Sequence, residues 1–188
     1  MISQSKKEQS VVLIKPDGIR RGLIGEIISR LEKAGLILAA CKMVWVNREL
    51  AAQHYGYNDS WFENIGKKIH RFYEEHGMDA NEDFGKLTNH QMGELVQQWN
   101  VDYLTEGPVL AMIWEGPGVI EAIRKIVGST YPLSALPGTI RGDFGIDSPA
   151  LSNTEKRSVH NLVHASGTME EAQLERQLWF REKEIKKS

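Results

Sequence analysis

The stretch SVVLIKPDG, residues 10–18, sets the start of the fold. Its four consecutive apolar residues are mostly β-branched, which is typical of a short buried strand. The following Pro-Asp-Gly favours a turn that carries the chain out of the sheet. Lys15 directly follows the apolar run, so we expect its side chain at the end of a strand, where sheets commonly bind ligands.

Outward from this strand, short apolar runs alternate with segments of helical spacing. Ile24, Ile27 and Leu31 recur at the helical interval, and Gly35 is placed to end that helix. The expected strands are residues 10–14, 36–46, 109–114 and 161–164, and the expected helices are residues 24–34, 48–54, 119–127 and 168–178. This order predicts an α+β fold, a ferredoxin-like sandwich whose four-stranded antiparallel sheet is covered by helices.

Two polar segments interrupt the alternation. Residues 59–100 are charged and keep helical spacing on either side of residues 77–87, which predicts a helical insertion within a single domain of residues 1–188. Residues 147–158 form a second polar segment, in which Ser152 and Glu155 have the spacing of a capping box. The roles of these segments stay open at this stage.

The composition is that of an ordinary globular protein. Its 23 basic and 25 acidic residues give a net charge of −2, which argues against nucleic acid or an anionic membrane as partner. The lone cysteine, Cys41, fits a reducing compartment. Residues 1–9 lack the apolar core of a signal peptide, and the longest apolar run, residues 109–114, is too short to span a bilayer. We therefore expect a cytoplasmic protein.

Three segments carry polar residues among glycines and prolines, a composition that is not typical of a hydrophobic core. They are KPDG (residues 15–18), PGTIRGD (residues 137–143) and NLVHAS (residues 161–166). The two commonest phosphate-binding loops, and the cysteine and histidine spacing of zinc sites, are missing from the sequence. Taken alone, His164 would more often be structural than catalytic.

These segments closely resemble those of nucleoside diphosphate kinases, from about residue 10 to residue 180. The strings KPDG, RGLIGEI, GPV, WEG, PGTIRGDF and NxxHAS all occur in the family's order. Six short motifs in one register are difficult to attribute to chance. The resemblance implies a transferase of nucleotide metabolism, a nucleotide-binding and ATP-binding kinase that becomes a phosphoprotein during its reaction.

The resemblance also assigns roles residue by residue. His164 would be the phosphorylated nucleophile, Glu175 would orient its imidazole, and Lys15 would contact the transferring phosphate. Phosphate, ribose and neighbouring positions would be filled by Arg124, Thr130, Arg141, Asn161, Tyr55 and Ser166. The chemistry is sound, because neutral imidazole is a good nucleophile and a carboxylate on one ring nitrogen fixes its tautomer.

The implied reaction is a ping-pong exchange. ATP or another nucleoside triphosphate would phosphorylate His164, and any nucleoside diphosphate would then accept the group. Mg²⁺ would arrive on the nucleotide phosphates rather than on a protein site. The family also forms homo-oligomers, hexamers or tetramers, and residues 129–138 match a loop used in that assembly. Base preference is left open by the sequence.

The chain departs from the family pattern at several positions. The segment between Tyr55 and Gly107 is long, and we interpret its insertion as a helical lid that alters base access or subunit contacts. For the aromatic residue that stacks on the base, Phe62 is our first candidate and Trp61 is nearly as good. Gly167 stands where the family has an acidic residue.

Elsewhere, His160 replaces a common arginine, and residues 144–161 are longer than usual. Two other classes of function remain as alternatives. The first is a non-catalytic nucleotide-binding protein that has kept the fold, although such a protein would be expected to have lost His164 or Lys15. The second is a nucleic-acid-binding protein, which the net charge of −2 disfavours.

Overall fold

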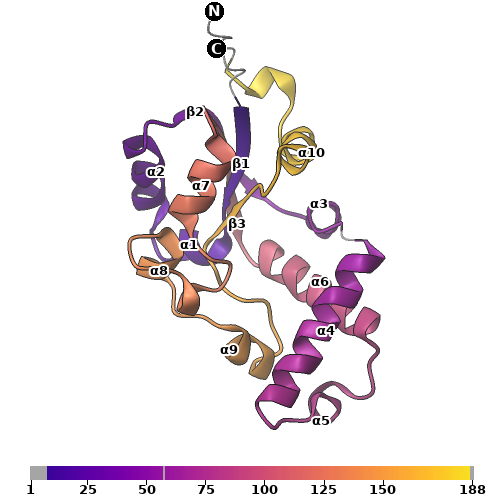
Figure 1. Ribbon diagram of the computed structural model, residues 1–188. Helices are drawn as coiled ribbons and strands as arrows, with labels where there is room; N and C mark the ends of the chain where they lie inside the picture. Colours follow the sequence, from indigo (N-terminus) through magenta and orange to yellow (C-terminus); the bar gives the residue numbers. More distant parts are fainter. Residues whose placement is uncertain (1–7, 57, 187–188) are drawn as a thin grey trace, which may run out of the picture.

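The protein is described from a computed structural model, in which residues 8–56 and 58–186 are placed (Figure 1). This part of the chain forms one four-stranded antiparallel sheet in the order β2-β3-β1-β4. The strands are β1 (Glu8–Ile14), β2 (Ile37–Trp45), β3 (Pro108–Gly116) and β4 (Val163–Ala165). The sheet and its covering helices confirm the predicted ferredoxin-like α+β sandwich.

The register of β1 brings two distant motifs to one end of the sheet. On one side β1 pairs with β3, from Glu8 opposite Gly116 to Ile14 opposite Leu110. On its other side it pairs with β4, where Leu13 lies opposite His164. Because Lys15 follows β1 directly, it leaves the sheet beside the short strand that carries His164.

The two faces of the sheet are covered by different helices. Helices α2 (Ile24–Lys33) and α7 (Val119–Val127) pack on the face that presents Val12 and Trp114. Helices α3 (Arg48–His54) and α10 (Met169–Trp179) pack on the face that presents Leu13. Each fully buried aliphatic or aromatic side chain contributes about 1.5–3 kcal/mol, so this alternation along β1 holds both layers.

The segment after α3 forms a helical hairpin that extends away from the sheet (Figure 1). It consists of α4 (Asp59–Glu75), the short α5 (Ala80–Phe84) and α6 (Asn89–Thr105). A small core of its own gathers around Ile69, Tyr73 and Met92. The sequence predicted two helices here; α5 is an additional turn, begun by the side chain of Asp79, which accepts from Asn81 N.

Helix α6 continues beyond the polar segment of residues 59–100. Its last turns carry Val101 and Leu104 into the main core beside the sheet. The hairpin is therefore anchored at its far end by the same hydrophobic cluster that holds α3 and α10.

The remaining helices are short. They are α1 (Pro16–Arg20), α8 (Ile140–Phe144) and α9 (Pro149–Thr154), with 3₁₀ turns at Pro132–Ser134 and Glu182–Glu184. None of the helices in the described ranges is long and apolar enough to cross a membrane.

The capping box predicted at Ser152 is wrong. Helix α9 begins at Pro149, and Ser148 is its cap, accepting a hydrogen bond from Leu151 N at 3.2 Å. Ser152 lies inside the helix, where its hydroxyl donates to Pro149 O. A proline at the first helical position favours the earlier start, because it has no amide N–H to leave unpaired. The helix predicted over residues 168–178 is confirmed as α10, and Thr168 caps it, since its side chain accepts from Glu171 N.

Two glycines let α4 and α6 touch backbone to backbone. A Cβ at Gly66 would lie 1.9 Å from the carbonyl oxygen of Asn89, and a Cβ at Gly93 would lie 2.3 Å from that of Phe62. Real side chains do not approach backbone so closely, so any other residue would force the helices apart.

We expect Gly66→Ala to lower the free energy of unfolding by about 2 kcal/mol, within the usual cost of overpacking. Denaturant titration would measure this loss, and hydrogen exchange would locate it in residues 59–105. The control is Gly25→Ala in α2, where nothing lies within 4 Å of the new Cβ. Gly25→Ala should stabilise the protein by about 0.5–1 kcal/mol. Equal effects of the two substitutions would contradict the close packing.

Candidate active site

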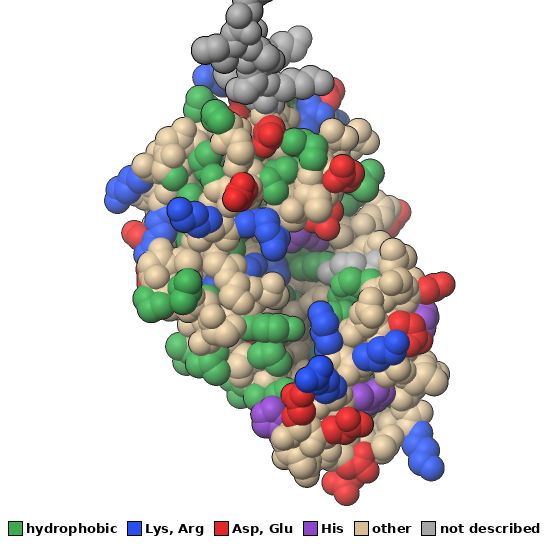
Figure 2. Space-filling model, in the orientation of Figure 1, with side chains coloured by type: hydrophobic (Ala, Val, Ile, Leu, Met, Phe, Trp, Pro, Cys, Tyr) green, Lys and Arg blue, Asp and Glu red, His purple; other side chains and the backbone are tan. Residues whose placement is uncertain are grey.

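A cavity of about 940 Å³ opens between the sheet and the hairpin (Figure 2). Lys and Arg side chains gather along its edges. Most of the residues singled out from the sequence line it, namely Lys15, Tyr55, Arg124, Thr130, Arg141, Asn161, His164 and Glu175. This volume lies in the range of small-molecule sites in proteins. Ser166 lies behind Glu175 and is fully buried, and Phe62 is not among the lining residues.

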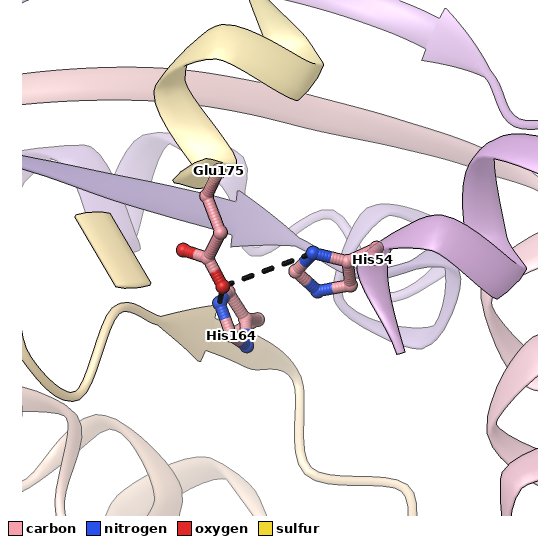
Figure 3. A group of neighbouring side chains, drawn as sticks. All are labelled: His54, His164 and Glu175. Atoms are coloured by element: carbon pink, nitrogen blue, oxygen red, sulfur yellow. Dashed lines mark hydrogen bonds and ion pairs between the residues drawn. The ribbon is translucent and has the colours of Figure 1, made fainter. Parts of the chain in front are cut away.

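A chain of hydrogen bonds holds the imidazole of His164, and Figure 3 shows its first bond, to Glu175. Its Nε2 lies 2.6 Å from Glu175 Oε1, and Ser166 Oγ donates to Glu175 Oε2 at 2.7 Å. Ser166 Oγ in turn accepts from Val11 N at 3.1 Å. Because a carboxylate accepts hydrogen bonds, Nε2 of His164 is the protonated nitrogen and Nδ1 carries the lone pair. The neighbouring hydroxyl and the carboxylate fix both the tautomer and the orientation of the ring.

Two hydrogen bonds, here named the clasp, join the KPDG turn (residues 15–18) to Leu162, the residue before β4. Lys15 N donates to Leu162 O at 2.8 Å, and Leu162 N donates to Asp17 Oδ2 at 3.2 Å. Leu162 itself has a φ of 69°, a conformation that is costly for a residue with a side chain. Gly18 allows the close approach, since a Cβ there would lie 3.2 Å from Leu162 O and 2.8 Å from Ile14 Cγ2. The clasp thus places His164, two residues later, against Lys15.

Lys15 is a buried cation in this cavity. Its Nζ donates to Asn161 Oδ1 at 2.9 Å and lies 4.8 Å from the centre of the Tyr103 ring. Burial, with a smaller contribution from the nearby Arg141, lowers the pKa of Lys15 to about 7, although Asp17 opposes the shift. An anionic phosphate would restore the favourable environment that the ammonium group lacks.

Arg141 organises the backbone around the site. Its guanidinium donates to the carbonyl oxygens of Asn161, Gly128, Ser129 and Val163 at 2.5–3.1 Å. Burial lowers its pKa to about 10, which leaves it charged at neutral pH. Four of its five N–H groups therefore bind the backbone of two segments, residues 128–129 and 161–163, and join both to α8.

The other two predicted phosphate contacts, Arg124 and Thr130, are exposed on the rim. Beside Arg124, Gly167 N donates to Glu171 Oε2 at 2.7 Å. A Cβ at Gly167 would lie 2.8 Å from that oxygen and 3.2 Å from Arg124 Nη1. The carboxylate of Glu171 therefore fills the space that an acidic side chain at position 167 would need.

The hairpin forms the opposite wall of the cavity. Trp61, on the first turn of α4, lines it, whereas Phe62 is buried between α4 and α6 and packs on His90 with ring centres 5.0 Å apart. The structure thus brings Trp61 to the site and leaves our first candidate, Phe62, outside it. Neighbouring residues on a helix point about 100° apart, and the sequence offered no means of telling which of two aromatic rings faces inward.

Three residues in the site carried no role in the sequence analysis. Asp17 holds the start of β4, and Tyr103 accepts a hydrogen bond from Asn161 N at 3.2 Å beneath Lys15. His54 lies with its ring centre 4.4 Å from that of His164. Asp17 could have been suspected from the KPDG motif. No local signal distinguishes Tyr103 or His54 from ordinary helix residues.

Comparison with known proteins identifies the family. The family model described as nucleoside diphosphate kinase matches residues 8–70 and 61–185. The chain belongs to the nucleoside diphosphate kinase family. Nucleoside diphosphate kinases of Pyrobaculum aerophilum and Acaryochloris marina are 44% and 42% identical to it over 178 residues, covering 95% of this chain and 97% and 91% of those proteins.

Solved structures agree with this family assignment. The crystal structure of an NDP kinase from Pyrobaculum aerophilum matches with a TM-score of 0.94 at 42% identity, covering 97% of this chain and all (100%) of that one. A nucleoside diphosphate kinase from Borrelia burgdorferi, solved as a transition-state mimic with vanadate and ADP, matches with a TM-score of 0.77 at 34% identity, covering 97% and 92%. As a member of this family, the chain is a nucleotide-binding kinase.

The lowered pKa of Lys15 predicts how stability depends on pH. A lysine of pKa about 7 when folded and 10.5 when unfolded destabilises the fold most below pH 7, and this cost disappears as the pH rises toward 10.5. We expect Lys15→Met to gain stability relative to wild type as the pH falls from 10 to 6. Thermal melts across this range would measure the gain. The exposed Lys33→Met is the control, and parallel curves for Lys15→Met and wild type would contradict the shift.

Proposed function

We propose that the protein transfers the γ-phosphate of ATP, or of another nucleoside triphosphate, to nucleoside diphosphates through a phosphohistidine at His164. The observation that carries this proposal is the hydrogen bond of 2.6 Å between His164 Nε2 and Glu175. It leaves the Nδ1 lone pair as the nucleophile in a cavity lined by Lys15, Arg124 and Arg141.

In the first half-reaction, Nδ1 of His164 attacks the γ-phosphorus in line with the leaving oxygen. The new N–P bond forms as the bond between the γ-phosphorus and the bridging oxygen breaks, and ADP departs with that electron pair. The ring becomes cationic, and Glu175, held by Ser166, stabilises the charge through the Nε2 proton. A nucleoside diphosphate then attacks the phosphohistidine by the reverse path.

The cations supply the electrostatic part of catalysis. Phosphoryl transfer spreads negative charge over three equatorial oxygens, so positioned cations lower its barrier. Lys15 reaches the site from the sheet, Arg141 from α8 and Arg124 from α7. We assign the transferring phosphate to Lys15 and the remaining phosphates to the two arginines and Thr130.

Mg²⁺ belongs to the substrate in this proposal. Within the described residues, the group of potential metal ligands is His54, His164 and Glu175, all within 4.8 Å of one another. Two imidazoles do not suit Mg²⁺, which prefers oxygen ligands and retains several waters. We therefore propose that the ion enters on the nucleotide phosphates and is held there opposite the cationic side chains.

The two polar segments cooperate in forming the base end of the cavity. Ser158 Oγ donates to Asn100 Oδ1 at 2.6 Å, and Lys156 Nζ donates to Asp83 O at 2.7 Å. The segment around α9 is thereby tied to the hairpin, and both line the same cavity. We propose that the hairpin acts as a wall over the nucleotide base, with Trp61 stacking on it and Asn161 near the ribose.

We also propose that the protein works in the cytoplasm as a homo-oligomer, a hexamer or a tetramer. Strand β2 lies at the edge of the sheet and exposes Met43 and Trp45, the latter with 76% of its surface accessible. Leu133 and Leu136 are exposed in the loop of residues 129–138. Apolar side chains on an edge strand favour association with a second copy. Sedimentation equilibrium would measure the state, and a monomer at all concentrations would overturn this part of the proposal.

The decisive experiment incubates the protein with γ-labelled ATP and Mg²⁺ beside His164→Ala. We expect an acid-labile, base-stable label on the wild type that passes to added GDP, and no label on the variant. A folded wild type that binds ATP but takes no label would overturn the proposal and favour a protein that binds nucleotide without catalysis.

A second prediction separates the two aromatic candidates. Trp61→Ala should raise the KM for nucleotide about tenfold, since base–aromatic stacking contributes about 1–3 kcal/mol, and should leave the melting temperature nearly unchanged. Phe62→Ala should lower the melting temperature, because it removes a buried side chain between α4 and α6. Steady-state kinetics and thermal melts of both variants test this. The reverse pattern would return the stacking role to Phe62.

A further inference from the structure

His54 is a buried histidine that the proposed reaction does not use. It ends α3, its side chain is 1% exposed, and its ring meets that of His164 edge to face, with centres 4.4 Å apart and planes at 82°. Its Nδ1 lies 3.8 Å from Oε1 of Glu175, the oxygen that also receives the proton of His164 (Figure 3). A second imidazole so close to the catalytic carboxylate needs a physical explanation.

Trp179 determines the tautomer of His54. The indole N–H of Trp179 lies 3.3 Å from His54 Nδ1. An indole nitrogen can only donate, so Nδ1 accepts and the proton of His54 sits on Nε2, which is buried and has no hydrogen-bond partner among the described residues. The Nδ1 atom of His54 therefore presents a lone pair, and not an N–H group, to the carboxylate of Glu175.

Trp179 is placed to compete with His164 for the carboxylate of Glu175. Trp179 and Glu175 are four residues apart on α10, so they share one face of the helix. Both are buried, and a buried indole N–H without an acceptor costs about 1–3 kcal/mol. If His54 Nδ1 were removed, the carboxylate of Glu175 would become the acceptor for the indole N–H of Trp179. A hydrogen bond from Trp179 would then draw the carboxylate of Glu175 away from His164.

We propose that His54 is a positioning residue: by accepting the N–H of Trp179 on Nδ1, it reserves the carboxylate of Glu175 for His164 and keeps the nucleophilic Nδ1 of His164 deprotonated. It takes no part in the bonds that form and break, and acts through Glu175. This inference rests on the phosphohistidine mechanism proposed above.

The surroundings of His54 keep it neutral, as this role requires. The titratable groups that face it are Glu175 on α10, His164 on β4, Lys15 after β1 and its neighbour Tyr55. Burial, followed by the proximity of His164 and Lys15, holds the pKa of His54 well below its ordinary value. A protonated His54 would direct an N–H at Glu175 Oε1 and compete with His164 for the same oxygen.

The test is a double-mutant cycle on the rate of His164 phosphorylation by ATP in a single turnover. We expect His54→Phe to slow this step about tenfold, in the range of coupling within one hydrogen-bond network, with nucleotide affinity unchanged. Trp179→Phe should also slow it, because His54 is then free to place its proton on Nδ1 and donate to Glu175. The double variant, which lacks both donor and acceptor, should be faster than either single variant.

Two further variants complete the design. His54→Asn offers an amide oxygen close to the position of Nδ1, so it should accept from Trp179 and rescue most of the rate. The exposed His76→Phe, at the end of α4, is the matched control and should phosphorylate at the wild-type rate. A wild-type rate for His54→Phe, or a double variant no faster than His54→Phe, would overturn the proposal.

Nitrogen-15 NMR of the wild-type imidazoles makes the test independent of how the variants fold. Both His54 and His164 should carry their proton on Nε2 at neutral pH. A His54 protonated on Nδ1, or charged, would overturn the proposal while leaving the kinase function intact. Failure of the wild type to take any label from ATP would instead reject the phosphohistidine itself, so the two failures are distinguishable.

Discussion

The site depends on a pair of buried hydrogen bonds that join the backbone of Lys15 and the side chain of Asp17 to the backbone of Leu162. Strand β4 has three residues, too few to be positioned by its own pairing with β1. The clasp supplies what is missing: it holds the start of β4, including the costly left-handed backbone of Leu162, against the end of β1. Because Lys15 belongs to the clasp and His164 follows Leu162 by two residues, the same bonds that hold β4 on the sheet also bring Lys15 and His164 to one end of it.

Electrostatics around this clasp favour binding over stability. Lys15 and Arg141 are both buried, and burial lowers the pKa of each, which means that the folded protein bears the cost of desolvating their charges. Arg141 recovers part of that cost through four carbonyl oxygens, and Lys15 recovers less through Asn161 and the ring of Tyr103. A bound phosphate would complete the set of partners. Sites of this kind exchange some stability for affinity toward the transition state.

The hairpin of α4, α5 and α6 is connected to this site through α6. Helix α6 begins in the hairpin and ends in the main core, where Tyr103 lies under Lys15 and its hydroxyl accepts from Asn161 N. In the middle of α6, Gln97 Nε2 donates to the carbonyl oxygen of Tyr55, the residue that directly follows His54 and α3. The hairpin and the residues around Lys15 and Asn161 therefore share one helix, so a displacement of the hairpin would also move those residues.

The sequence by itself determined what local pattern controls. Short apolar runs specified the strands, apolar residues at helical spacing specified the helices, and their order specified the sandwich. The family motifs placed His164, Lys15 and Glu175 in one register. Only the tertiary structure decided which of Trp61 and Phe62 faces the cavity, that Ser148 and not Ser152 caps α9, and that His54 meets Glu175. The physical reason is that these outcomes depend on contacts between residues far apart in the chain. The local spacing of apolar and polar residues does not reveal the free energies of such contacts.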